Sequence, residues 1–185
     1  DWYTPAFKAG GPISSIYNLT HFLEEEFNFY IVTSNKDLNS KKELQGIKTN
    51  EWQQINKSKV IYLDERNQNK KMLKKIVEDI NPDKIYLNGI FSFFFSVLPC
   101  YLFNKSFEII INPRGMFGSS ALSKKKFKKL FFIKLVNIMS FYKNICWHVS
   151  NEAEFSELRN NIEVVTKYSI IPNLPKVLKH VNNKR

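Results

Sequence analysis

Short runs rich in β-branched and aromatic residues recur along the chain, and segments with helical spacing separate them. Each run reads as a strand, and the runs are residues 29–33, 60–63, 84–87, 107–111, 145–149 and 168–171. A first helix begins at Pro12, and further helices are predicted at residues 70–80, 91–103, 123–142 and 152–159. This alternation predicts an α/β fold with a doubly wound parallel sheet and helices on both faces.

The length of the chain and two of its segments bear on how it is organised. With 185 residues, 43% of them hydrophobic, it has enough apolar material for one core, and we expect a single domain. Residues 35–59 are polar and lysine-rich, which predicts a loop with a short hairpin. Residues 85–103 lack charge and approach the length of a membrane span, but Asn88-Gly89 and Pro99 interrupt them. A strand, a turn and a buried helix explain this segment better than a span.

The charge of the chain is strongly positive. Lys and Arg number 28 against 17 Asp and Glu, a net charge of +11, which attracts phosphates, anionic lipids or nucleic acid without choosing among them. Cys100 and Cys146 lie in apolar surroundings and read as buried free thiols of a reducing compartment. We therefore expect a cytoplasmic protein, free or peripheral to the inner face of the membrane, without a metal or redox site.

The strongest candidate for an anion site is Arg114. It follows the predicted strand 107–111 and stands between Pro113, which restricts the backbone, and Gly115, which permits a sharp turn. Ligands of open α/β sheets bind at the carboxyl ends of strands, and Arg forms bidentate hydrogen bonds with phosphate or carboxylate. The alternative is a surface Arg in a tight turn.

Gly10-Gly11-Pro12 opens the first helix. Glycines there let backbone amides approach an oxyanion, and the helix N-terminus supplies partial positive charge. The alternative is a flexible lead-in whose Pro marks the first helical turn.

Other polar residues at strand ends have plainer interpretations. Asn151 and Glu154 fit a capping box at the start of a helix. His148 reads as a satisfied core residue rather than a base, and Asp64 and Glu65 read as solvated rather than bound to substrate hydroxyls. The sequence contains no Ser-His-Asp set, metal-ligand spacing or phosphate loop of the Walker type.

Residues 123–142 mix lysines with apolar side chains, as in a helix that lies on an anionic membrane surface. The candidate membrane-facing lysines are Lys124, Lys125, Lys128 and Lys129. The alternative is a helix whose apolar side packs on the sheet while its lysines face water.

The order of these motifs resembles the amino-terminal, acceptor-side domain of family 4 glycosyltransferases. The resemblance covers almost the whole chain, and it rests on Gly10-Gly11-Pro12, Pro113-Arg114-Gly115-Met116, Ser150 with Glu152 and Glu154, and Ile171-Pro172-Asn173. It implies a Rossmann-like domain that forms one half of a GT-B architecture. It also implies retaining transfer of a sugar from a nucleotide-diphosphate donor to a glycan or lipid-linked acceptor, in polysaccharide biosynthesis, without cofactor or metal.

The resemblance also implies positions for the site residues. Gly10 and Gly11 would form the donor-phosphate loop, whereas the acceptor side of the cleft would include Arg114, Gly115, Asn88, Ser150 and Glu152. Catalytic residues are not assigned, and Asn173 matches the pattern without a chemical role.

The chain departs from the family pattern in three places. The strand that precedes the glycine loop is missing, Tyr86-Leu87-Asn88-Gly89 replaces a histidine, and Asn173 is followed by leucine instead of glycine. We expect a strand upstream of Asp1, a nucleotide-sugar domain downstream of Arg185, and no turnover by residues 1–185 alone. The competing interpretation is a non-catalytic basic module at an anionic membrane. A nucleic-acid partner is not expected, because no groove-reading or stacking motif is present.

Overall fold

The computed structural model describes residues 1–123 and 125–175, which form an α/β structure with two separate sheets. Their contacts divide the chain into two compact units. The three-stranded unit comprises Trp2–Asp64 and residues 173–175, and the four-stranded unit comprises Asp1 and Glu65–Pro172. The predicted single parallel sheet is therefore present as two sheets, and each unit is described by itself.

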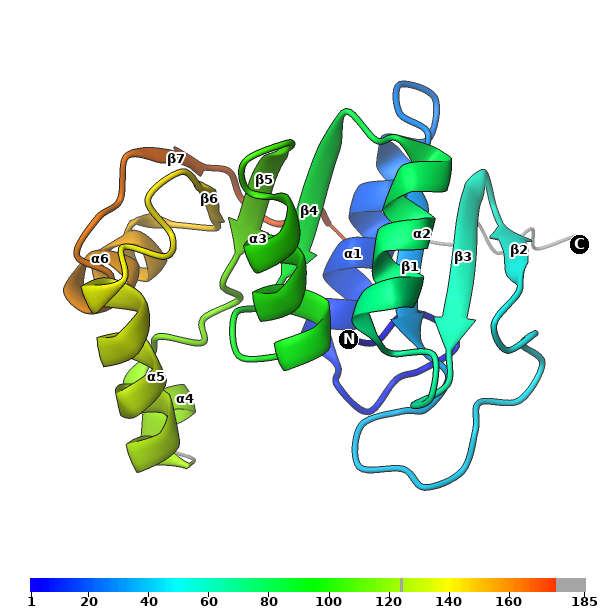
Figure 1. Cartoon of the computed structure of the whole chain (residues 1–185), viewed down its shortest axis with the longest axis horizontal. Helices are drawn as coiled ribbons and strands as arrows, with labels where there is room; N and C mark the ends of the chain where they lie inside the picture. Colours follow the sequence, from blue (N-terminus) through cyan, green and yellow to red (C-terminus); the bar gives the residue numbers. More distant parts are fainter. Residues whose placement is uncertain (124, 176–185) are drawn as a thin grey trace, which may run out of the picture. The chain divides into compact units, whose positions relative to one another are not determined.

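The three-stranded unit contains helix α1 (Gly11–Phe22) and a mixed sheet of order β1-β3-β2 (Figure 1). Strand β1 (Tyr30–Ser34) pairs in parallel with β3 (Ser58–Leu63), and β2 (Trp52–Ile55) pairs antiparallel with β3. Asn56, in the left-handed region at φ 52°, makes the turn between β2 and β3. The short hairpin expected in residues 35–59 is thus confirmed.

The core of this unit forms around the buried side chains of Tyr3, Val60 and Tyr62. Ile16 and Tyr17 of α1 pack against these side chains, so α1 covers the sheet with the apolar face that its spacing predicts. The Tyr3 hydroxyl pairs with Thr20 at 3.0 Å, which satisfies two buried polar groups of the core.

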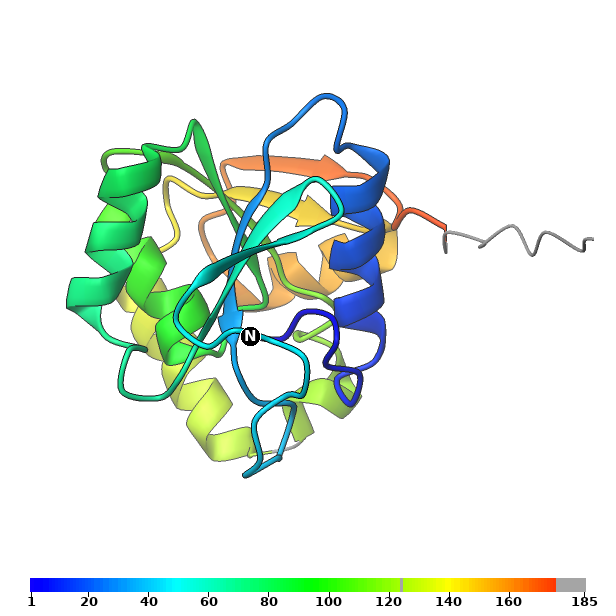
Figure 2. The same cartoon turned by 90° about the vertical axis from the view of Figure 1, so that its right-hand side faces the viewer.

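The four-stranded unit contains an all-parallel sheet of order β4-β5-β6-β7. The strands are β4 (Lys84–Asn88), β5 (Glu108–Asn112), β6 (Cys146–Val149) and β7 (Lys167–Ile170), the last two side by side in Figure 2. All six predicted strands are present, with ends shifted by one or two residues. Asn88 lies opposite Asn112, so the carboxyl ends of β4 and β5 are level.

The two faces of this sheet differ in chemistry because side chains alternate along each strand. Leu87, Trp147 and Val149 lie on a fully apolar, buried face together with Ile109 and Ile111. The opposite face carries Tyr86, Asn88, Asn112 and His148, together with Ile110 and Cys146. A polar face that runs to the carboxyl ends of three neighbouring strands is where a polar ligand would be met.

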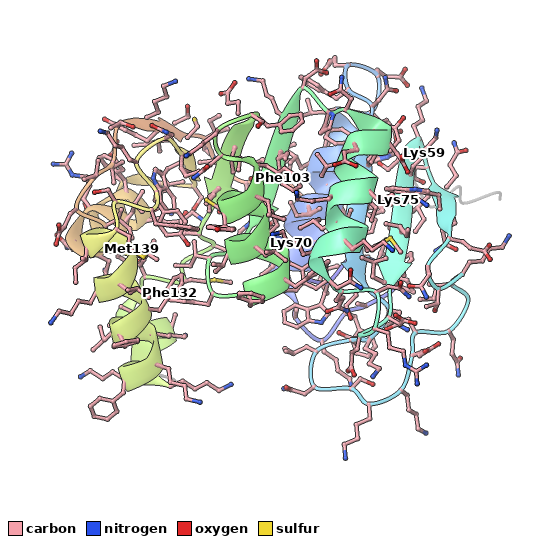
Figure 3. The ribbon with its side chains drawn as sticks, viewed as in Figure 1. Lys59, Lys70, Lys75, Phe103, Phe132 and Met139 are labelled. Carbon is pink, nitrogen blue, oxygen red and sulfur yellow. The ribbon has the colours of Figure 1, made fainter. Side chains whose placement is uncertain are left out.

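Helix α2 (Lys70–Ile80) matches its predicted bounds and is capped by Asn69, whose side chain accepts from Met72 N at 2.9 Å. Its lysines are exposed, and Lys70 and Lys75 are labelled in Figure 3. The uncharged segment after it divides into β4, a π-helical turn η1 (Phe93–Val97) and α3 (Leu98–Phe103). None of the helices in the described residues is long and apolar enough to cross a membrane.

The helix predicted over residues 123–142 is present but shorter at both ends. The structure has α4 (Ser119–Ser123) and α5 (Lys126–Ile138), separated where Lys125 adopts a left-handed backbone at φ 57°. The hydroxyl of Ser123 donates to Ser120 O at 2.7 Å and so satisfies a carbonyl at the end of α4. Lys129 N then donates to Lys125 O at 3.2 Å, which starts the next helix.

Gly89 makes the turn after β4 and touches the motif that follows β5. Its φ is 104°, and a Cβ on Gly89 would lie 2.8 Å from Met116 Cε. Met116 therefore occupies space that only a glycine leaves open, and its sulfur lies 3.5 Å from Ile90 N. This contact links Asn88-Gly89 to Pro113-Arg114-Gly115-Met116.

Gly89→Ala should destabilise the four-stranded unit by about 1 to 3 kcal/mol, chiefly through backbone strain at φ 104°, with a smaller part from displacement of the flexible end of Met116. The measurement is the free energy of unfolding in urea. Met116→Ala in the same chain should recover the packing part of the loss and leave the strain. Equal losses with and without Met116→Ala would contradict the proposed contact.

Candidate functional site

Arg114 lies at the carboxyl edge of the four-stranded sheet and is held there by two asparagines. Its backbone N–H donates to Asn112 Oδ1 at 3.0 Å, and its Nε donates to Asn88 Oδ1 at 2.6 Å. Asn88 and Asn112 are opposite residues of β4 and β5. The structure thus brings together Asn88 and Arg114, two residues that the sequence assigns to one site.

The backbone aims the Arg114 side chain. Arg114 and Gly115 both have left-handed conformations, at φ 54° and 65°. The sharp turn expected at Gly115 is present, and it begins one residue earlier, at a residue type that rarely adopts this backbone. Strain of this kind persists only where surrounding contacts hold it, and it is common at binding sites.

Glu154 supplies those contacts and was missed as a site residue. This carboxylate is only 6% exposed. Its Oε1 accepts from Gly115 N at 2.6 Å, and its Oε2 accepts from both the backbone N and the hydroxyl of Ser150 at 2.7 Å. One buried charge therefore joins the loop after β5 to the loop after β6.

The start of helix α6 (Glu152–Asn161) is half of the predicted capping box. Asn151 Oδ1 accepts from Glu154 N at 2.9 Å, as expected. The Glu154 side chain turns instead to Ser150 and to Gly115. We call Asn88, Asn112, Arg114, Gly115, Ser150 and Glu154 the Arg114 cluster.

The electrostatics keep Arg114 charged in a partly buried place. Burial lowers the pKa of Arg114 from its ordinary value, whereas Tyr86 and Glu154 act to raise it. An Arg stays protonated under such shifts because its pKa starts above 12. The cluster therefore presents a fixed guanidinium charge to any ligand.

Tyr86 and His148 continue the polar face beside this cluster. The Tyr86 hydroxyl lies 2.8 Å from His148 Nδ1, and His148 Nε2 lies 2.9 Å from Ile171 O. Because a carbonyl only accepts, Nε2 carries the proton and Nδ1 accepts from Tyr86. Burial raises the pKa of Tyr86, so its proton stays available for this bond. His148 is satisfied on both nitrogens, as expected for a structural residue.

Gly10 and Gly11 belong to the three-stranded unit. Gly10 precedes α1 at φ 66°, and a Cβ on either glycine would meet no heavy atom within 4 Å. The first turn of α1 has no acidic residue and no side-chain cap. The N-terminus of α1 is therefore open, as the phosphate-loop interpretation requires.

Asp37 holds the segment that leads to this loop. The buried carboxylate accepts from Phe7 N at 3.0 Å, Lys8 N at 3.2 Å and Leu38 N at 2.7 Å. Burial acts to raise the pKa of Asp37, but these N–H groups outweigh it and lower the pKa below its ordinary value. The chain before Gly10 is thus fixed near the end of β1.

The remaining predicted site residues lie outside the Arg114 cluster. Glu152 is exposed in the first turn of α6, where its charge favours the helix. Asp64 exchanges hydrogen bonds with the Asn50 side chain at 3.0 and 3.1 Å. Lys125 and Lys128 are exposed, whereas Lys129 faces the packed side of α5. Lys124 lies outside the described residues.

Within residues 1–123 and 125–175, the structure contains no group of His, Cys, Asp and Glu side chains that would hold a metal ion. Comparison of the chain with protein-family models, with curated proteins and with solved structures found no match. The Arg114 cluster and the sequence resemblance are therefore the features that bear on function.

Glu154→Gln should destabilise the four-stranded unit by about 3 kcal/mol, because an amide nitrogen would face donors that now meet a carboxylate. The measurement is urea unfolding at neutral pH. Glu152→Gln is the matched control on the same helix and should cost less than about 1 kcal/mol. Similar losses for the two variants would contradict the anchoring role of Glu154.

The three-stranded unit should lose stability in acid through Asp37. Since its pKa is lowered on folding, Asp37 stabilises the fold above its unfolded pKa of about 3.9, and this contribution disappears as the pH falls through the lower folded pKa. Asp37→Asn should cost about 1 to 3 kcal/mol at neutral pH and progressively less in acid. The measurement is the midpoint of urea unfolding across this pH range. Asp79→Asn, at an exposed residue, is the control. A loss that does not change with pH would contradict the linkage.

Proposed function

We propose that the chain is the acceptor-side domain of a retaining, family 4-like glycosyltransferase of GT-B architecture. It would take part in polysaccharide biosynthesis, in transfer of a sugar from a nucleotide-diphosphate donor to a glycan or lipid-linked acceptor. The α/β structure is compatible with a Rossmann-like half of such an enzyme. The observation that carries the proposal is the Arg114 cluster.

The cluster supports this function because it joins residues that the resemblance assigns to one cleft. Asn88, Arg114, Gly115 and Ser150 come from three different strand ends and are linked directly or through Glu154. Amide, hydroxyl and guanidinium groups at a half-buried edge suit the hydroxyl-rich surface of a saccharide. Glu152 is exposed next to this edge and stays a candidate for its rim.

The proposed reaction needs one group that holds the leaving diphosphate and another that orients the acceptor. The bond between the anomeric carbon and the diphosphate oxygen breaks, and the acceptor oxygen forms the new bond at the same face of the sugar. The acceptor hydroxyl passes its proton to the departing diphosphate oxygen on that face, and the nucleoside diphosphate leaves with its remaining negative charge. Gly10 and Gly11 at the N-terminus of α1 would stabilise that charge, and the Arg114 cluster would orient the acceptor. No metal or cofactor is required in this scheme.

Arg114→Ala should weaken saccharide binding by at least about tenfold, the effect of losing a charged hydrogen bond. The test is an NMR titration of the 185-residue chain with oligosaccharides and detergent-solubilised lipid-linked saccharides, which should shift the amides of Gly115 and Ser150. Arg114→Lys should bind with intermediate affinity because an ammonium cannot fork.

Arg159→Ala is the control, since Arg159 is exposed on α6 with its guanidinium 6.0 Å from the Phe155 ring centroid. This variant should bind saccharide like the wild type. If none of the saccharides shifts these amides, or Arg114→Ala binds unchanged, the proposed acceptor site is wrong.

A further inference from the structure

Helix α5 is apolar on two opposite sides, and only one of them is packed. On the inner side Ile133 and Val136 are buried, and the ring of Phe132, labelled in Figure 3, meets Phe91 edge to face at 5.8 Å. Lys129 is also on this side, where it donates to Ala121 O and places its ammonium 4.8 Å from the Phe91 ring centroid. This side packs α5 against its unit, and the Asn137 side chain adds a hydrogen bond to Asn161 O at 2.8 Å.

The outer side of α5 exposes large apolar side chains. Phe127 is 88% exposed, Phe131 71% and Ile138 73%. Their spacing of four and seven residues places them on one stripe, and Leu130 and Leu135 fall on the same stripe. We call these five residues the outer stripe. A contiguous apolar surface of this kind is unusual on a protein that has no partner for it.

The charges around the outer stripe have one sign. Residues 109–151 contain no Asp or Glu. Lys126 and Lys128 flank the stripe, Lys134 lies within it, and Lys125 and Lys143 precede and follow the helix, all of them exposed. Lys side chains can lay their stems along an apolar surface and extend the ammonium groups to anions beyond it.

These features select the partner. A second copy of the chain would bring the same lysines together without carboxylates from this segment to compensate them. The stripe lies on a helix surface rather than in a groove, so a flat apolar layer with anionic groups at its border fits both parts of it. That is the chemistry of an anionic lipid bilayer.

We propose that α5 docks the chain on an anionic membrane, in the plane of the interface. Phe127, Phe131 and Ile138 enter the boundary between headgroups and acyl chains, and Lys126, Lys128 and Lys134 contact lipid phosphates. The proposal does not rest on the glycosyltransferase function, because it uses no residue of the Arg114 cluster.

The test is cosedimentation of the 185-residue chain with phosphatidylcholine vesicles, with or without phosphatidylglycerol. Binding should require phosphatidylglycerol and should weaken with salt, since the Debye length falls from about 10 Å at 0.1 M to about 3 Å at 1 M. Joint replacement of Phe127, Phe131 and Ile138 by Ala should weaken binding at least about tenfold. Phe7→Ala, at a side chain 74% exposed in the three-stranded unit, is the control and should bind normally.

A second set of variants compares how much the lysines of two helices contribute to vesicle binding. Replacement of Lys125, Lys126, Lys128 and Lys134 by Gln should weaken binding about 600-fold, since each lysine near an anionic surface contributes about fivefold and the four contributions multiply. The matched control replaces Lys70, Lys71, Lys74 and Lys75 of α2 by Gln. These lysines are also exposed, and their replacement removes the same charge. Similar losses for both variants would mean non-specific attraction and would overturn the proposal.

Two further measurements test whether the outer stripe enters the bilayer. In Phe131→Trp, brominated acyl chains should quench the new indole, whereas an indole in water would not be quenched. Analytical ultracentrifugation should detect no wild-type dimer that is lost in the triple Ala variant. An unquenched indole, a dimer lost with the outer stripe, or no binding to anionic vesicles would each overturn the proposal.

Discussion

The buried carboxylate of Glu154 is the constraint on which the candidate site depends. It accepts from Gly115 N, Ser150 N and the Ser150 hydroxyl, so two loops that leave neighbouring strands share one anchor. A buried carboxylate is costly unless several donors meet it, and here they do. Without this anchor, the left-handed backbone at Gly115 would lose the side-chain contact that ties it to the loop after β6.

At the same edge of the sheet, ordinary contacts fix the orientation of the Arg114 side chain. Asn112 holds the Arg114 backbone, Asn88 holds its Nε, and Met116 packs against Gly89 in the turn after β4. The last two contacts link the end of β4 to the segment after β5, so the geometry depends on the parallel register of these strands. A ligand that meets this edge therefore meets groups oriented in advance, which lowers the ordering cost of binding.

Helix α5 illustrates a different use of apolar residues. Its inner side packs and its outer stripe does not, although both sides read as equally hydrophobic in sequence. The helix predicted from this segment is present but begins later than predicted, because Lys125 has a left-handed backbone. Which lysines face outward also needed the structure, since Lys129 turns inward to Phe91 and Ala121.

The sequence by itself determined the element types, because β-branched runs, helical spacing, Asn caps and Gly turns act within a few residues. It correctly predicted all six strands, α2, the hairpin at Asn56 and the turn at Gly115. It also placed Asn88, Arg114 and Ser150 at strand ends. Only the tertiary structure decided that Glu154 joins Gly115 to Ser150, and that the strands form two sheets. Strand order and register bring together residues about forty positions apart, and no local pattern encodes that pairing.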